Sequence, residues 1–173
     1  MSDYDTTDTG TDGADHVVVE EHTDGSATMI DDTDGDGVAN EVAYDTDGDG
    51  VADRVFTDTD GDGRLDTEVV DSNHDGTPDA MYADTDGDGR IDYVATDTDG
   101  DGQFDVVAAD TDGDGVADAY GVDTDGDGVI DRVAVDHNED GRIDAVASDT
   151  DHDGDLDTVT YNDAPSDPNP LAR

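Results

Sequence analysis

Apolar and polar positions recur along this chain with a fixed period of thirteen residues, in ten consecutive units from residue 32 to residue 161. Positions 1 to 6 of each unit are polar or glycine, and the apolar residues fall within positions 7 to 13. Position 11 is valine in seven units, and β-branched side chains favour strands. Seven residues between loops are too few for a stable helix. The pattern therefore predicts a loop at positions 1 to 6 and a strand at positions 7 to 13.

The strict repeat predicts an all-β fold in which one unit cannot bury its thin apolar stripe, whereas a stack of units can. Two arrangements fit. In a β-roll or solenoid, the loops form corners and the strands stack into two thin sheets around alanine, valine and isoleucine. In an antiparallel β-meander, each loop is the end of a hairpin. We favour the roll, because a free meander leaves one apolar face uncovered.

Segments outside the repeat register flank the array. Residues 1–14 are rich in aspartate, threonine and glycine and are predicted to be a disordered acidic leader. Residues 15–31 predict a capping hairpin, with strands at 16–21 and 27–30 joined through Asp24-Gly25. Residues 162–173 contain three prolines and are predicted to be an irregular tail.

The charge of the chain lies mainly in the loops. There are 52 acidic and 6 basic residues, and the net charge is −46. Positions 1, 3, 5 and 9 of the ten units hold 37 aspartates and three asparagines. Low hydrophobicity with high net charge is typical of disorder, and self-repulsion opposes compaction. The periodic valines indicate that this disorder is conditional.

Several classes of function are excluded or disfavoured by composition. The chain has no cysteine, so it forms no disulfide or thiolate metal site. No segment reaches transmembrane length, which argues against membrane insertion, and no basic patch exists to bind nucleic acid. The residues Met1 to Asp5 lack the features of a secretory signal. Either export uses another route, or a signal was removed, or the protein is intracellular; we expect an extracellular or cell-surface location.

The loops carry oxygen ligands at alternate positions around a glycine bend, which is what a hard cation such as calcium requires. Position 6 is glycine in every unit, whereas position 4 is glycine in seven and is otherwise His74, Glu139 or His152. We infer that position 6 needs a positive φ and that position 4 does not. The candidate ligands at position 1 are Asp32, Asp45, Asp58, Asp71, Asp84, Asp97, Asp110, Asp123, Asp136 and Asp149. Those at position 3 are Asp34, Asp47, Asp60, Asn73, Asp86, Asp99, Asp112, Asp125, Asn138 and Asp151. Those at position 5 are Asp36, Asp49, Asp62, Asp75, Asp88, Asp101, Asp114, Asp127, Asp140 and Asp153. Those at position 9 are Asn40, Asp53, Asp66, Asp79, Asp92, Asp105, Asp118, Asp131, Asp144 and Asp157.

The motif Asp-x-Asp-x-Asp-Gly-x-x-Asp resembles the calcium loops of EF-hands, dockerins, thrombospondin type 3 repeats and integrin-type propeller blades. The back-to-back form also resembles an uncharacterised family of Asp-Thr-Asp-Gly-Asp-Gly repeat proteins common in actinobacteria. The resemblance covers about three quarters of the chain. It implies up to about ten Ca²⁺ ions, each held at positions 1, 3, 5 and 9 and by the position 7 carbonyl. In the second unit these residues are Asp45, Asp47, Asp49, Asp53 and Val51.

One feature departs from an EF-hand. Position 12, where an EF-hand has a bidentate glutamate, is occupied by residues such as Ala43 and Phe56, and flanking helices are absent. A calmodulin-like switch is therefore not expected. A neighbouring unit is expected to supply the missing ligand, for instance from the next position 1 aspartate. Magnesium is disfavoured because it retains its waters and takes fewer protein ligands.

The remaining polar residues have simpler interpretations. His74, His137 and His152 lie in different units without ligand spacing, so we expect solvated side chains. Threonine at position 2 is expected to support the turn through local hydrogen bonds, although a threonine row also suits an ice or mineral lattice. Ten near-identical loops without a singular site argue against catalysis.

The sequence thus predicts a non-catalytic, calcium-binding repeat protein. Its folding is expected to be gated by Ca²⁺, and its role to be that of a structural or spacer module of an exported or surface protein. Two alternatives remain open, a high-capacity intracellular calcium buffer and an adhesive or mineral- or ice-binding surface. The protein partner is not defined by the sequence.

Overall fold

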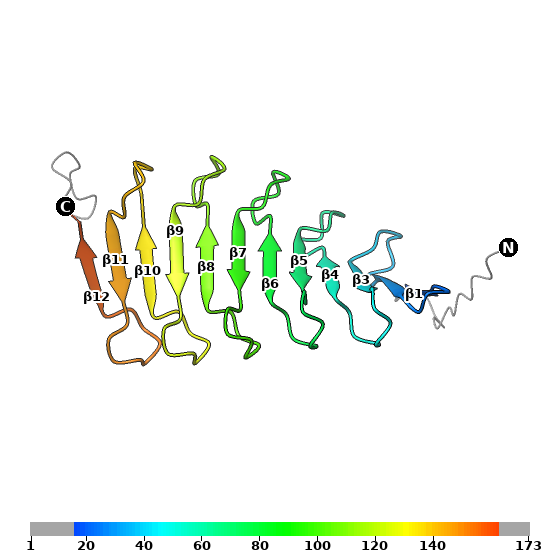
Figure 1. Cartoon of the computed structure of the whole chain (residues 1–173). Coiled ribbons are helices and arrows are strands. Elements are labelled where there is room, and N and C mark those ends of the chain that lie inside the picture. The colour runs from blue at the N-terminus through cyan, green and yellow to red at the C-terminus, as the bar shows by residue number, and fades with distance from the viewer. Residues whose placement is uncertain (1–15, 163–173) are drawn as a thin grey trace.

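The computed structural model describes residues 16–162, which form strands and loops without any helix (Figure 1). Twelve strands follow one another along the chain. They are β1 (His16–Glu21), β2 (Ala27–Asp32), β3 (Glu41–Asp45), β4 (Arg54–Thr57), β5 (Thr67–Val70), β6 (Ala80–Ala83), β7 (Tyr93–Thr96), β8 (Val106–Ala109), β9 (Ala119–Val122), β10 (Arg132–Val135), β11 (Ala145–Ser148) and β12 (Thr158–Tyr161). The predicted all-β repeat fold is confirmed. The predictions for residues 1–14 and for the tail beyond residue 162 lie outside the described residues.

The strands form one open sheet in the order β1 to β12, and each strand pairs antiparallel with the next. This is the meander, so the preference for a roll of two stacked sheets was wrong. Each loop reverses the chain, and the position 9 N–H closes it by donating to the position 13 carbonyl of the preceding strand. The Asp53 N–H, for example, lies 2.7 Å from the Tyr44 oxygen. Successive loops therefore lie at opposite ends of the strands (Figure 1).

The strands are shorter than predicted, because positions 7 to 9 belong to the loop. Strands β4 to β12 cover positions 10 to 13 only. Position 7 turns back into the loop, as when the Val51 N–H donates to Oδ1 of Asp49 at 2.8 Å. Position 9 is held by the hydrogen bond that closes the hairpin. Hydrogen bonds within the loop thus take the place of hydrogen bonds between strands in this part of the unit.

The predicted N-terminal hairpin is present. Strands β1 and β2 pair from His16↔Asp32 to Glu21↔Ala27, and the Gly25 N–H closes the turn on the His22 carbonyl at 3.0 Å. Strand β2 also pairs with β3. The hairpin thus continues the meander as its first two strands and does not cover the end of a roll.

Successive units place the same position on opposite faces of the sheet. The reason is the hairpin register, because position 12 of one unit pairs with position 11 of the next, as in Ala43↔Val55 and Ala95↔Val107. One face carries a central apolar row: Met29, Ala43, Val55, Val69, Met81, Ala95, Val107, Gly121, Val133, Ala147 and Val159.

The apolar core is thin, as the sequence predicts. Among the described residues the buried apolar side chains are four alanines, Ala43, Ala80, Ala83 and Ala95. On the other face an aromatic pair adds a local contact, with the Tyr44 and Phe56 ring centroids 6.0 Å apart and edge to face. Arg54 lies over the Phe56 ring and pairs with Glu68. None of the described residues belongs to a helix that is long and apolar enough to cross a membrane.

Candidate metal sites

Position 1 of each unit anchors the loop, and we name each loop by this residue. In the Asp45 loop, Oδ1 accepts the Gly48 N–H at 2.7 Å and Oδ2 accepts the Gly50 N–H at 3.0 Å. The same pair of hydrogen bonds recurs in the Asp84 loop, where the donors are Gly87 and Gly89. One carboxylate thus fixes the bend at two backbone positions, so each loop holds its shape through local contacts.

Both bend positions adopt positive φ, which corrects the prediction for position 4. Position 6 has φ between 81° and 96°, which an L-residue rarely adopts. The glycines at position 4 have φ between 74° and 80°, and His74, Glu139 and His152 have values of 60°, 54° and 58°. These lower values lie near the left-handed minimum of about 57°, which L-residues reach at a cost. Side chains are therefore tolerated at position 4, although it is left-handed.

The carboxylates at positions 1, 3 and 5 converge. Oxygen atoms of Asp45, Asp47 and Asp49 lie within 4.8 Å of one another, and the same holds in the Asp32 and Asp58 loops. Backbone N–H groups direct the side chains, since the Asp49 N–H donates to Oδ1 of Asp47 at 3.1 Å. In these three loops the structure thus brings together the position 1, 3 and 5 carboxylates that the sequence assigns to the site.

The position 9 carboxylate is held by position 2 of its own loop. Asp118 accepts the Thr111 N–H at 2.9 Å and the Thr111 hydroxyl at 2.7 Å. The prediction that threonine supports the turn is confirmed, and these hydroxyls face the loop carboxylates. In the Asp45 loop, the Thr46 hydroxyl and N–H, together with His74, lower the pKa of Asp53 to about 2. Asp53 is thus held as a carboxylate.

Aspartates outnumber apolar residues among the buried side chains. The buried polar residues of the described part are position 1 and position 9 aspartates: Asp32, Asp53, Asp71, Asp105, Asp118, Asp123, Asp131, Asp136 and Asp149. One of their oxygens, Oδ1 of Asp136, is buried without a hydrogen-bond partner. A buried carboxylate oxygen without a donor is costly unless a cation faces it. This donor set, all oxygen and all anionic or amide, fits calcium.

Repulsion between the converging carboxylates is evident in the Asp149 loop. The negative charges of Asp153, Asp157 and Asp149 raise the pKa of Asp151. These four residues occupy positions 1, 3, 5 and 9, so the charges of the three other predicted ligands of the loop all act on Asp151. A divalent cation among them would remove the repulsion.

Loops that are two units apart lie side by side at one edge of the sheet. The Asp71 N–H donates to the Asp53 carbonyl at 2.8 Å, and the Asp123 N–H donates to the Asp105 carbonyl at 2.7 Å. The loop of the next unit is at the opposite edge. The expectation that its position 1 aspartate supplies a missing ligand is therefore wrong. The adjacent loop comes 26 residues later in the sequence, and in the Asp71 and Asp149 loops its position 4 side chain contacts the earlier site.

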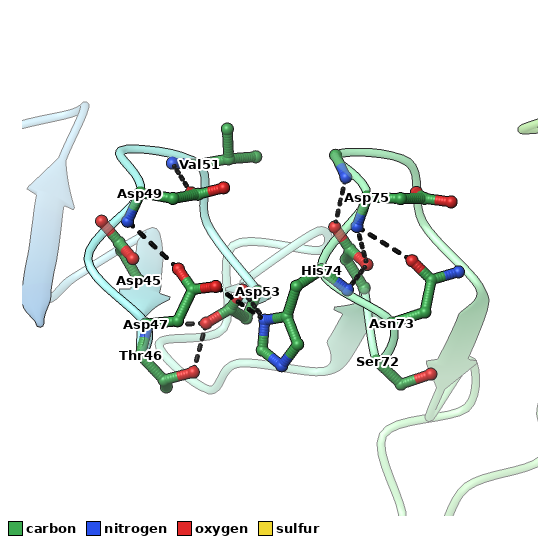
Figure 2. Close-up of polar contacts among 12 residues, drawn as sticks. Asp45, Thr46, Asp47, Asp49, Val51, Asp53, Ser72, Asn73, His74 and Asp75 are labelled. Atoms are coloured by element: carbon green, nitrogen blue, oxygen red, sulfur yellow. Dashed lines mark hydrogen bonds and ion pairs between the residues drawn. The ribbon is translucent and has the colours of Figure 1, made fainter.

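Two histidines at position 4 reach carboxylates of the earlier loop, which corrects the prediction that they are solvated. The His74 Nδ1 lies 2.6 Å from Oδ1 of Asp53 and 3.7 Å from Oδ2 of Asp47 (Figure 2). The hydrogen bond with Asp53 raises the pKa of His74. The spacing of 21 residues between His74 and Asp53 becomes a contact only when loops alternate between edges. This alternation is the signal that the sequence reasoning missed.

The second histidine repeats this geometry. The His152 Nδ1 lies 2.8 Å from Oδ2 of Asp125 and 3.1 Å from Oδ1 of Asp131. The charge of Asp125 and the hydrogen bond with Asp131 raise the pKa of His152. Glu139, the third side chain at position 4, lies against the earlier Asp110 loop, where hydrogen bonds with Asp114 and Asp112 raise its pKa to about 7.

Comparison with protein-family models, with curated proteins and with solved structures finds no match to this chain.

Proposed function

We propose that this chain is a non-catalytic calcium-binding repeat protein whose folding is gated by Ca²⁺, and that it acts as a structural or spacer module. The observation that carries the proposal is the convergence of the Asp45, Asp47 and Asp49 carboxylates, with oxygens within 4.8 Å of one another, in a loop that recurs along the sheet. Oxygen ligands at alternate positions around a glycine bend suit the flexible coordination of calcium.

Calcium would supply the charge neutralisation that the sheet requires. Ten divalent ions would reduce the magnitude of the net charge, from −46 to −26. The four buried alanines offer little hydrophobic stabilisation against this repulsion. The free energy of ion binding would then appear largely as free energy of folding.

The shape of the fold supports a spacer role. The sheet grows by one strand per unit, and each strand contacts only its two neighbours. Repeat arrays of this kind set a distance through the number of units. Position 2 hydroxyls, such as that of Thr111, are bonded to position 9 carboxylates, which disfavours a threonine row that binds ice or mineral.

Equilibrium dialysis of the full chain against ⁴⁵Ca²⁺ tests the proposal. We expect several bound ions and the loss of one in Asp45→Asn/Asp47→Asn. The matched control, Glu20→Gln/Glu21→Gln, removes the same charge outside the loops and should retain every ion. Absence of binding, or an equal loss in both variants, would contradict the proposal. Millimolar affinity fits an extracellular role, whereas submicromolar affinity would favour an intracellular buffer.

A further inference from the structure

The two histidines at position 4 lie where a second kind of metal site forms between neighbouring loops. In the Asp45 loop, Oδ1 of Asp47 accepts the Asp49 N–H, and Oδ2 of Asp53 accepts the Thr46 N–H at 2.6 Å. The other oxygen of each carboxylate, Oδ2 of Asp47 and Oδ1 of Asp53, faces Nδ1 of His74 (Figure 2). One nitrogen and two oxygens therefore converge from two loops.

The arrangement occurs twice and involves the same positions each time. The ligand atoms of Asp47, Asp53 and His74 lie within 4.8 Å of one another, and so do those of Asp125, Asp131 and His152. Asp53 and Asp131 are both buried and are both held by a position 2 threonine. Each histidine is half exposed, with 41 % and 46 % of the side chain accessible, so a cation can reach the site from solvent.

We propose that these two clusters, Asp47–Asp53–His74 and Asp125–Asp131–His152, bind a transition-metal dication of the zinc type. Imidazole nitrogen with carboxylate oxygens is a donor set for zinc and its neighbours, whereas calcium takes oxygen ligands alone. Three protein ligands leave a coordination position for water. Asp47 and Asp53 are also the position 3 and position 9 calcium candidates of the Asp45 loop, so a zinc ion here and a calcium ion in the loop would share these two ligands.

The alternative role for each histidine is an ion pair that links two loops without any metal. Both roles are consistent with short contacts between Nδ1 and the carboxylates, but only the metal site gives a defined zinc stoichiometry. Suitable test variants replace a histidine by the residue that is most common at the same position of the other units. His74→Gly and His152→Gly install the residue found at position 4 of seven loops, and His137→Thr installs the residue found at position 2 of eight.

A new site can also be built by the same rule. A Cβ atom at Gly113 would lie 3.5 Å from Oδ2 of Asp86, and the φ of Gly113 is 77°. Gly113→His would thus place an imidazole against the Asp84 loop in the way that His74 meets the Asp45 loop. Asp92, at position 9 of that loop, accepts the Thr85 hydroxyl and supplies the third ligand.

The experiment is a zinc titration of the full chain in millimolar calcium, with bound zinc counted by competition against a chromophoric chelator. The ¹⁵N resonances of the imidazoles identify the ligands. We expect two zinc ions in the parent chain and in His137→Thr, one in each single glycine variant, none in the double variant and three in Gly113→His. The His74 and His152 imidazoles should shift on zinc addition, while that of His137 stays in place. Absence of zinc binding, or a zinc count that is unchanged in the double variant, would overturn the proposal and would leave the calcium proposal intact.

Discussion

The backbone N–H of Asp71 lies 2.8 Å from the carbonyl oxygen of Asp53, which ties the Asp71 loop to the loop two units earlier. The same backbone hydrogen bond, from position 1 of one loop to position 9 of the loop two units earlier, recurs along both edges of the sheet. The first runs from Asp58 to Asn40, and the last from Asn162, which follows the final unit, to Asp144. An ion that orders one loop therefore also orders an acceptor for the next. We expect calcium binding along each edge to be cooperative. Binding at one loop already orders part of the neighbouring loop, so the second ion costs less conformational entropy.

The loops should differ in affinity. The Asp71 and Asp136 loops have an amide at position 3, Asn73 and Asn138, so each presents one carboxylate fewer to the ion. Pro78 further removes an N–H from the Asp71 loop. We predict that these two loops and the ends of the array open first at intermediate calcium. The middle of the array, from the Asp84 loop to the Asp123 loop, should remain closed.

Hydrogen exchange measured at half-saturating calcium checks this order. Asn73→Asp should tighten the Asp71 loop by roughly 1–2 kcal/mol, since a unit charge at about 4 Å in water contributes about 1 kcal/mol per charge of the ion. Uniform protection across all loops, or weakest protection in residues 97–122, would contradict the ranking.

The two glycines of one loop should respond differently to substitution. Gly89 has φ 91° and Gly87 has φ 75°, and a Cβ atom at either would meet nothing within 4 Å. Any loss of stability on substitution therefore comes from backbone strain and not from a steric clash. We predict that Gly89→Ala destabilises the sheet by about 1–2 kcal/mol and Gly87→Ala by less, because 75° is nearer the left-handed minimum. Urea unfolding at fixed calcium measures both, and a larger loss in Gly87→Ala would refute the argument.

The link between positions 2 and 9 should be measurable by removing one hydroxyl. The Thr111 hydroxyl donates to Asp118, a buried aspartate. Thr111→Val removes this donor and should cost roughly 1–2 kcal/mol of unfolding free energy, whereas Thr111→Ser keeps the donor and should cost less. Unfolding in urea at saturating calcium distinguishes them. Equal stabilities of the two variants would show that the hydroxyl does not hold Asp118.

Glu139 should act on the loop that it faces and not on its own. Its carboxylate meets Asp114 and Asp112 of the Asp110 loop, and their proximity raises its pKa to about 7. Under the calcium proposal, Glu139→Gln should weaken binding at the Asp110 loop by roughly 1 kcal/mol and leave the Asp136 loop unchanged. The amide resonances of Gly115 and Gly141 report the two loops separately during a calcium titration. A change confined to Gly141 would be the opposite result.

The sequence was sufficient to predict the loops, the all-β class and the hairpin that begins at His16, because each depends on local chemistry. The topology was not predictable in this way. A thirteen-residue unit fits a roll or a meander, and the choice depends on whether each loop closes a hairpin, as the bond from Asp53 to Tyr44 shows. The pairing of position 12 with position 11, as in Ala43↔Val55, depends on the hairpin register as well, since an antiparallel pair shifted by one residue would match position 11 with position 11.

The candidate calcium ligands were predictable, and the histidine contacts were not. Converging carboxylates follow from a contiguous motif, so Asp45, Asp47 and Asp49 were found from spacing alone. His74 meets Asp53 only because loops alternate between the two edges of the sheet. Glycine frequency was also misleading at position 4, since a left-handed residue near φ 60° accepts a side chain.

Calcium-gated folding is the central claim, and far-ultraviolet circular dichroism during a calcium titration of the metal-free chain tests it most directly. The account predicts a disordered spectrum at low salt without metal and a cooperative gain of β structure as calcium is added, because a net charge of −46 opposes a core of four buried alanines. A metal-free chain that already shows the full β signal and melts cooperatively at low salt would contradict it.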